Sequence, residues 1–246
     1  MKRTERHHLK ENELAHLART AQQVMEERRS LASVILIAVA VVAVAAIGYF
    51  TWRGSVEGRA HALLAEALTI ETARVGPPPA PGTPSQGLVY PTAREKQEAA
   101  LAKFKAVADQ YPSSDAGQFA RYREATTQMA LGNTKEALDL YQQVIDRAGD
   151  GIYGQMARLG QAQAQARAGQ FDPAINTYKE LSLHKDGPLP VDGILMQLGQ
   201  TYLEAGKPTD AQQTFTRIVE EFPESPFSGD ARRELDTLKK TSASAT

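Results

Sequence analysis

The chain has 246 residues, a formal net charge of −1 and 42% hydrophobic residues, which leaves room for one modest folded domain. Lysine and arginine are balanced by aspartate and glutamate, so the sequence lacks the broad basic footprint that nucleic acid binding requires. It contains no cysteine, which excludes disulfides, cysteine-ligated zinc, a thiol nucleophile and a lipidated N-terminal cysteine.

Residues 1–30 are polar and rich in charge, and Arg28 and Arg29 directly precede an apolar run. The opposite flank of that run offers only Arg53 and Arg59. Lysine and arginine beside a membrane helix favour the cytoplasmic side. We therefore expect residues 1–30 in the cytoplasm and the chain beyond the run outside it.

Residues 31–50, with the sequence LASVILIAVAVVAVAAIGYF, carry no charge and are mostly aliphatic. A helix of this length spans ~30 Å, the thickness of a bilayer's hydrocarbon core. A core helix of a soluble domain would keep a polar stripe, and the apolar region of a cleaved signal peptide is only about 7–15 residues long. Tyr49 and Trp52 fit the aromatic belt at a membrane interface. Residues 31–52 are therefore predicted to be an uncleaved transmembrane anchor.

The next two segments differ in composition. In residues 53–75, Leu63, Ala67 and Ile70 recur on one face, which predicts an amphipathic helix. Residues 76–91 hold six of the chain's thirteen prolines, a density that forbids helix and favours extended structure. They are predicted to be a proline-rich linker.

From Thr92 onward the sequence repeats at a fixed interval of 37 residues. A small, an aromatic and an aliphatic residue recur in step across four copies. The three series are Ala100, Ala137, Ala174 and Ala211; Phe104, Tyr141, Tyr178 and Phe215; and Val107, Val144, Leu181 and Ile218. Spacings of four and three residues place each set on one face of a helix.

Gly132, Gly169 and Gly206 stand five residues before the alanines of the later copies, which indicates a turn after a preceding helix. Asn133, with glutamate three residues on, is expected to form a capping box, and Asp172, followed by proline, an N-cap. The pattern predicts an all-α fold. In it, a solenoid of antiparallel helix pairs covers residues 92–240, including a C-terminal capping helix, and a disordered tail follows at 241–246.

The last copy resembles the tetratricopeptide repeat (TPR) family most fully. At the family's spacings its two helices carry Leu195, Leu198, Gly199 and Tyr202, then Ala211, Phe215, Ile218 and Pro223. Ala125 and Ala162 replace the glycine in earlier copies, and the period of 37 departs from the usual 34. In the first copy, residues 60–74 either complete the helix pair or cover the groove. The resemblance implies a TPR-type α-solenoid and is specific for fold more than for function.

The order of anchor and array resembles YfgM-like ancillary subunits of the bacterial Sec translocon. That resemblance implies a single-pass protein of the bacterial inner membrane with a periplasmic TPR domain. Its implied partners are translocon subunits, periplasmic chaperones or client polypeptides, with lipid around residues 31–52. The array is also similar to TPR proteins of envelope assembly, such as the lipoprotein subunit of the outer-membrane β-barrel machinery, although the missing cysteine excludes a lipoprotein.

The sequence shows no glycine-rich phosphate loop, no His-Glu-x-x-His and no Gly-x-Ser-x-Gly motif. We therefore predict no catalytic residue, no metal and no cofactor. A membrane-anchored protein–protein interaction scaffold, assisting translocation, chaperone recruitment or envelope assembly, is the favoured function. The alternatives are a structural subunit that tethers a membrane complex and an enzyme with an unrecognised site.

The resemblance also implies a peptide-binding groove lined by the first helix of each pair. Counting from the matched alanines, the expected lining residues are Phe119, Tyr122, Met129, Met156, Leu159, Gln163, Met196, Gln200 and Leu203. This mostly apolar lining predicts an apolar or amphipathic ligand segment. Family members that clamp a C-terminal carboxylate use Lys and Asn where this chain has Tyr122 and Thr126, so such a clamp is not predicted.

Overall fold

The computed structural model describes residues 3–77, 87–185 and 187–244, with side chains described over 33–77, 87–185 and 187–241. Its helices are α1 Arg3–Glu71, α2 Ala93–Gln110, α3 Asp115–Leu131, α4 Thr134–Ala148, α5 Ile152–Arg167, α6 Phe171–Ser182, α7 Val191–Glu204, α8 Pro208–Glu221 and α9 Ser228–Ser244. Two short strands, β1 Arg74–Val75 and β2 Val89–Tyr90, lie between α1 and α2. The all-α class is confirmed, and the chain divides into two units, Met1–Ser55 and Val56–Thr246.

The first unit is the N-terminal part of α1. Among the described residues, α1 is the helix long and apolar enough to cross a membrane, and nothing in its most apolar stretch is buried. Val34, Leu36 and Val44 are each more than 60% exposed. The alternative of a core helix packed inside this chain is therefore contradicted, since such a helix would be covered on most sides.

In the second unit, the end of α1 completes the first helix pair, which resolves the choice left open for residues 60–74. Ala60, Leu64 and Ala67 are buried in one cluster with Phe104 and Val107 of α2. Spacings of four and three residues place Ala60, Leu64 and Ala67 on one face of α1. The amphipathic face therefore packs against α2 as the first helix of the array.

Strands β1 and β2 pair in parallel and bring the two ends of the proline-rich segment together. The Arg74 amide donates to the Leu88 carbonyl at 3.2 Å, and the Gly76 amide donates to the Tyr90 carbonyl at 3.0 Å. Most of the linker predicted over 76–91 lies outside the described residues, as does part of the tail predicted over 241–246. Helix α9 continues to Ser244, past the expected boundary at residue 240.

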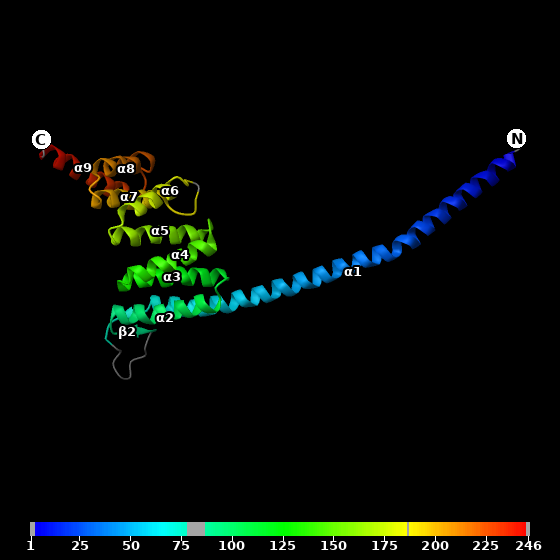
Figure 1. Ribbon diagram of the computed structural model, residues 1–246, viewed down its shortest axis with the longest axis horizontal. Coiled ribbons are helices and arrows are strands. Elements are labelled where there is room, and N and C mark those ends of the chain that lie inside the picture. The colour runs from blue at the N-terminus through cyan, green and yellow to red at the C-terminus, as the bar shows by residue number, and fades with distance from the viewer. Residues whose placement is uncertain (1–2, 78–86, 186, 245–246) are drawn as a thin grey trace. The chain divides into compact units, whose positions relative to one another are not determined.

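Helices α2 to α8 stack in chain order, each beside its neighbours in sequence (Figure 1). The three predicted series form the core of this stack: Ala137, Tyr141 and Val144 of α4, for example, are each at most 2% exposed. Gly132 and Gly206 adopt φ values of 89° and 71°, as a helix-ending glycine should. Each helix pair thus buries its apolar face against the next pair.

The turns between helices explain why two predicted caps are wrong. Asn133 makes no side-chain cap; its amide group donates instead to Gln128 Oε1 at 2.8 Å. Its backbone N–H closes the preceding helix on the Gln128 carbonyl at 2.9 Å, which holds ψ at 60° rather than in the extended region an N-cap needs. Gln170 has the same role and a ψ of 68°, so α6 begins at Phe171 and Asp172 lies within its first turn.

In the helix pairs after the first, α3, α5 and α7 are the first helices and α4, α6 and α8 are the second. Glycines in α5 and α7 let aromatic rings of α4 and α8 lie close to the backbone of these first helices. A Cβ at Gly160 would lie 2.5 Å from Cε1 of Tyr141, and one at Gly199 would lie 2.4 Å from Cε1 of Phe215. Both rings are buried and held by their neighbours. Gly160 was not singled out from the sequence.

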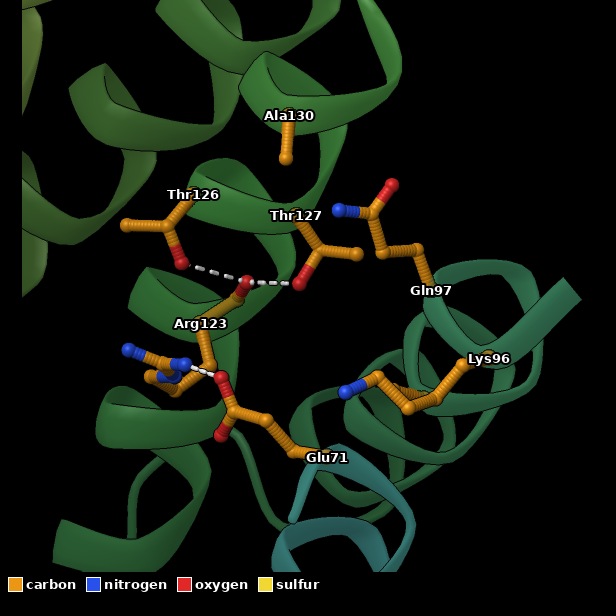
Figure 2. Close-up of a pocket in the computed structure, with 8 residues that line it drawn as sticks. Glu71, Lys96, Gln97, Arg123, Thr126, Thr127 and Ala130 are labelled. Carbon is orange, nitrogen blue, oxygen red and sulfur yellow. Dashed lines mark hydrogen bonds and ion pairs between the residues drawn. The ribbon is translucent and has the colours of Figure 1, made fainter. Parts of the chain in front are cut away.

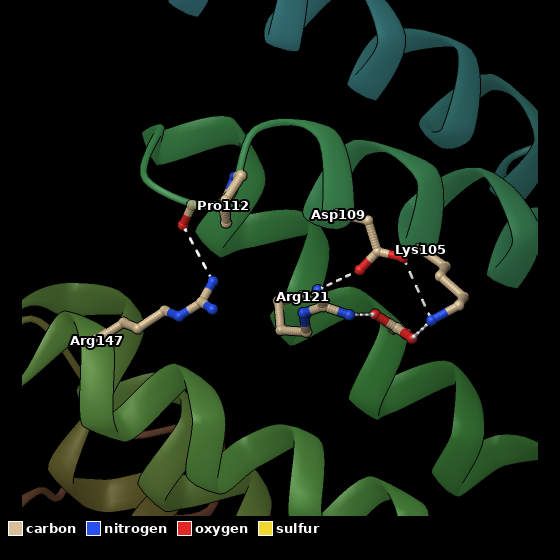
Figure 3. A network of polar contacts seen from close by, with 6 residues as sticks. Lys105, Asp109, Pro112, Arg121 and Arg147 are labelled. Carbon is tan, nitrogen blue, oxygen red and sulfur yellow. Dashed lines mark hydrogen bonds and ion pairs between the residues drawn. The ribbon is translucent and has the colours of Figure 1, made fainter.

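A charged network joins α2 to α3 (Figure 3). Arg121 forms ion pairs of 2.6 Å with Glu124 and 2.5 Å with Asp109, and Lys105 lies 3.3 Å from Asp109. The Glu124 side chain is only 3% exposed. Its burial raises the pKa of the carboxyl group, while the charge of Arg121 acts in the opposite direction. Nearby, Arg147 donates to the Pro112 carbonyl at 3.5 Å.

Candidate binding groove

Three pockets follow one another along the first helices and share residues, so they form one groove. The α2–α3 pocket has a volume of about 170 Å³, the α3–α5 pocket about 180 Å³ and the α5–α7 pocket about 340 Å³. Thr126 and Ala130 line the first and second pockets, and Gln163 and Arg167 line the second and third. We call this run of pockets the groove.

Most residues that line the α2–α3 pocket have polar or charged side chains, and two of them form an ion pair (Figure 2). Arg123 pairs with Glu71 at the end of α1, and its guanidinium carbon lies 5.8 Å from the centre of the Phe104 ring. Thr126 and Thr127 both donate to the Arg123 carbonyl at 2.8 Å. Because Glu71 holds Arg123, this cation is already neutralised within the chain.

The α3–α5 pocket lies where Tyr141 meets Gly160. Its other lining residues include Met129, Gln163 and Arg167. Without a Cβ at Gly160, the buried ring of Tyr141 reaches the pocket wall. The pocket therefore combines an aromatic edge, a primary amide and one cation.

The α5–α7 pocket is held by a hydrogen-bonded glutamine pair. Gln163 Nε2 donates to Gln197 Oε1 at 2.8 Å, and the Tyr178 hydroxyl donates to the same oxygen at 3.1 Å. These bonds fix Gln163 and Gln197, while Gln200 and Glu204 are exposed. The wall of the α5–α7 pocket is therefore more polar than the mostly apolar lining expected from the sequence.

The charge of Arg167 influences the pKa values of two buried tyrosines. Burial raises the pKa of both the Tyr141 and the Tyr178 hydroxyl, and the positive charge of Arg167 acts on both in the opposite direction. A single guanidinium thus acts on groups in two adjoining pockets.

The groove residues recur at the same interval as the core. Three positions of the first helix supply it in successive repeats: Arg123, Gly160 and Gln197; Thr126, Gln163 and Gln200; and Ala130, Arg167 and Glu204. Each set is spaced by 37 residues. This polar register, whose residue types vary between copies, is the signal in the sequence that could have identified the groove.

Of the nine residues expected in the groove, Met129, Gln163 and Gln200 line these pockets. Phe119 and Tyr122 lie in an aromatic cluster, with ring centres 6.3 Å apart and Tyr122 6.0 Å from Tyr141. The remaining four do not line the three pockets: Met196 is 7% exposed, Leu159 and Leu203 pack against the core, and Met156 is half-buried. Tyr122, Leu159 and Met196 each directly precede a residue that lines the pockets. Because consecutive residues of a helix point about 100° apart, their side chains face away from the groove.

No group of three His, Asp or Glu side chains that could hold a metal occurs within the part of the chain the structure describes. The stacked helix pairs and their groove define an α-solenoid of the protein-interaction type. The chain belongs to the tetratricopeptide repeat-like domain family, which matches residues 29–226. This family is generally non-catalytic, and no enzyme family is found.

Two solved structures are similar to this chain at low sequence identity, and the first of them shows the same fold. TPR-like repeats assigned to a kinesin light chain of Podosopora anserina match with a TM-score of 0.53 and 15% identity, over 61% of this chain and 80% of that one. A tetratricopeptide repeat protein from Parabacteroides merdae matches with a TM-score of 0.49 and 18% identity, over 60% of this chain and 56% of that one. No curated protein matches the sequence.

Proposed function

We propose that this protein is a single-pass membrane scaffold that holds extended segments of partner proteins in its groove. The observation that carries the proposal is the repeated register, because three equivalent positions in three successive repeats line one continuous run of pockets. Membership of a TPR-like family supports a protein ligand. The polar lining favours a segment bound through hydrogen bonds and charge, in place of the apolar ligand expected from the sequence.

The proposed location is the inner membrane of a bacterium, with the N-terminus in the cytoplasm and the array in the periplasm. Exposure of the apolar part of α1 supports the anchor, and Arg28 with Arg29 supports the orientation. A role in protein translocation, chaperone recruitment or envelope assembly fits this location. The partners would then be translocon subunits, chaperones or client polypeptides.

Site-specific photo-cross-linking in native membranes tests the proposal. A photoreactive residue replaces Gln200 in the groove or, as the matched control, Gln213, an exposed glutamine of α8 that lines none of the three pockets. We expect protein cross-links from position 200 and few from position 213. Equal cross-linking from both positions would contradict a groove ligand. A single stoichiometric partner would identify a fixed subunit of a complex, and many partners would identify changing clients.

A further inference from the structure

Arg167 lines the groove, but no fold-stabilising contact among the described residues accounts for its positive charge there. It is the last residue of α5, is exposed, and lines both the α3–α5 and the α5–α7 pocket. No hydrogen bond or ion pair holds its guanidinium within the described ranges of the chain. Its place in the last turn of α5 is favourable for the helix dipole, but any solvent-facing position of that turn would serve equally.

The charges around Arg167 differ from one repeat to the next. At the equivalent position the preceding repeat has Ala130 and the following repeat has Glu204. The other groove arginine, Arg123, is paired with Glu71. In the α3–α5 pocket Arg167 is therefore a cation with no acid among the lining residues, whereas Glu204 adds a negative charge one repeat further along.

An extended polypeptide that followed the groove would meet these two charges in order. First helices of successive repeats are separated by about one helix diameter, roughly 10–12 Å. A segment in the extended polyproline II conformation covers this distance in about three residues at ~3.1 Å each, and side chains three residues apart then point to the same side. Because pockets continue on both sides of Arg167, the chain would pass through and present an internal side chain there.

We infer that the groove selects an extended segment with an internal aspartate or glutamate opposite Arg167 and a lysine or arginine three residues away opposite Glu204. This inference rests on the proposed function and names the chemistry of its ligand. The carboxylate would fit beside the Gln163 amide and the Tyr141 hydroxyl edge, which line the same pocket. Charge then selects the segment, while the Gln163 amide and the edge of the Tyr141 ring form the wall beside it.

The test uses the full-length protein in detergent and a displayed library of random decapeptides. Peptides that bind are then made with blocked ends as matched sets, in which the acidic residue is replaced by its amide. Three variants accompany the wild type. Arg167→Gln removes the cation, Arg158→Gln removes an arginine of the same helix that pairs with Asp150 at 2.8 Å outside the groove, and Ala130→Trp fills the α3–α5 pocket.

We expect selected peptides to carry an acidic and a basic residue three positions apart. The acidic peptide should bind about fivefold more tightly than its amide, as an ion pair of about 1 kcal/mol gives. That preference should vanish in Arg167→Gln, persist in Arg158→Gln and weaken with salt. Circular dichroism should show unchanged helix content in all three variants.

The remaining outcomes separate the two proposals. Peptides that lose binding in Ala130→Trp but show no preference for acid over amide would overturn the inference and leave the groove function standing. Peptides that need a free C-terminal carboxylate would also overturn it. If no decapeptide binds the wild type, or Ala130→Trp binds as the wild type does, the groove function fails and the inference fails with it.

Discussion

Gly160 shows how one missing methyl group shapes both the core and the groove. The repeat pattern does not indicate this glycine, because the family's glycine falls two positions later, at Ala162 in this copy. The ring it accommodates belongs to the preceding second helix, and that contact becomes visible only once α4 and α5 are packed.

We predict that Gly160→Ala destabilises the protein by roughly 1–3 kcal/mol, because the new methyl group overlaps the buried ring of Tyr141. Gly58→Ala is the matched control, since nothing lies within 4 Å of a Cβ there. That control should be neutral or stabilising by up to about 1 kcal/mol through helix propensity. Thermal unfolding followed by circular dichroism compares the two, and equal shifts in Tm would show that the close approach is unimportant.

Arg121 offers a second test at the level of one side chain. Removing it in Arg121→Met leaves the buried Glu124 without its 2.6 Å partner, which should cost roughly 3 kcal/mol at neutral pH. The pKa of Glu124 in the folded variant would rise further above its unfolded value. The folded state then binds more protons than the unfolded state, so the variant gains stability as the pH falls from 7 toward 5.

The measurement is the difference in Tm between the wild type and Arg121→Met at several pH values. This difference should shrink on acidification. Arg147→Met serves as the control, because Arg147 is exposed and, within the described part of the chain, its polar partner is the Pro112 carbonyl at 3.5 Å rather than a carboxylate. A difference that stays constant between pH 7 and 5 would show that Glu124 is not the group left uncompensated.

The helices themselves were largely predictable, because the core residues of a repeat array recur at a fixed interval, here 37 residues. Ala100, Phe104 and Val107 in α2 and their equivalents are buried as the three series predicted. The turns were less predictable. Asparagine is a common N-cap residue, but the turn between α3 and α4 has only two residues. Asn133 therefore closes the end of α3 through its backbone N–H and also directly precedes α4.

Most of the residues expected to line a groove lie outside the three pockets, although they belong to the same helices as the residues that do line them. Tyr122 and Met196 are apolar, and apolar residues near a groove are drawn into contacts with neighbouring helices. The polar residues that remain at the surface, such as Arg167 and Glu204, do not follow the hydrophobic period of the helix. Their 37-residue interval is present in the sequence, but the residue types vary between copies, so the packed structure is needed to show that the pockets occupy this face.

Glu57 near the start of the second unit links two elements that are distant in sequence. Its Oε1 accepts from the Ala116 amide at 3.1 Å, in the first turn of α3. A carboxylate there satisfies an otherwise free N–H and complements the helix dipole. Glu57→Ala should therefore cost about 1 kcal/mol.

Hydrogen exchange of α3 measures this effect. The first-turn amides of α3 should exchange faster in Glu57→Ala, while the first turn of α7, which begins after Pro190, should be unchanged. Glu66→Ala is the control, because Glu66 is an exposed residue of the same helix that pairs with Lys103 at 2.9 Å. Equal exchange in both variants would show that Glu57 does not cap α3.

At the scale of the whole molecule, the proposed topology is tested by a reporter enzyme that is active only in the periplasm, fused after Thr246. We expect activity, because the positive residues before the apolar part of α1 favour a cytoplasmic N-terminus. Exchanging Arg28 and Arg29 for glutamine should reduce it, whereas the same exchange at Arg232 and Arg233 in α9 should not. Activity of a cytoplasm-only reporter at this position would reverse the orientation.

Under the proposed function, the sharing of Gln163 and Arg167 by two pockets would limit how many ligands the array can hold. A guanidinium engaged by a group in the α3–α5 pocket is no longer available to a different molecule in the α5–α7 pocket. Neighbouring pockets therefore compete for their common wall. A titration should reach saturation at one ligand per chain, and two short segments should displace one another instead of binding side by side.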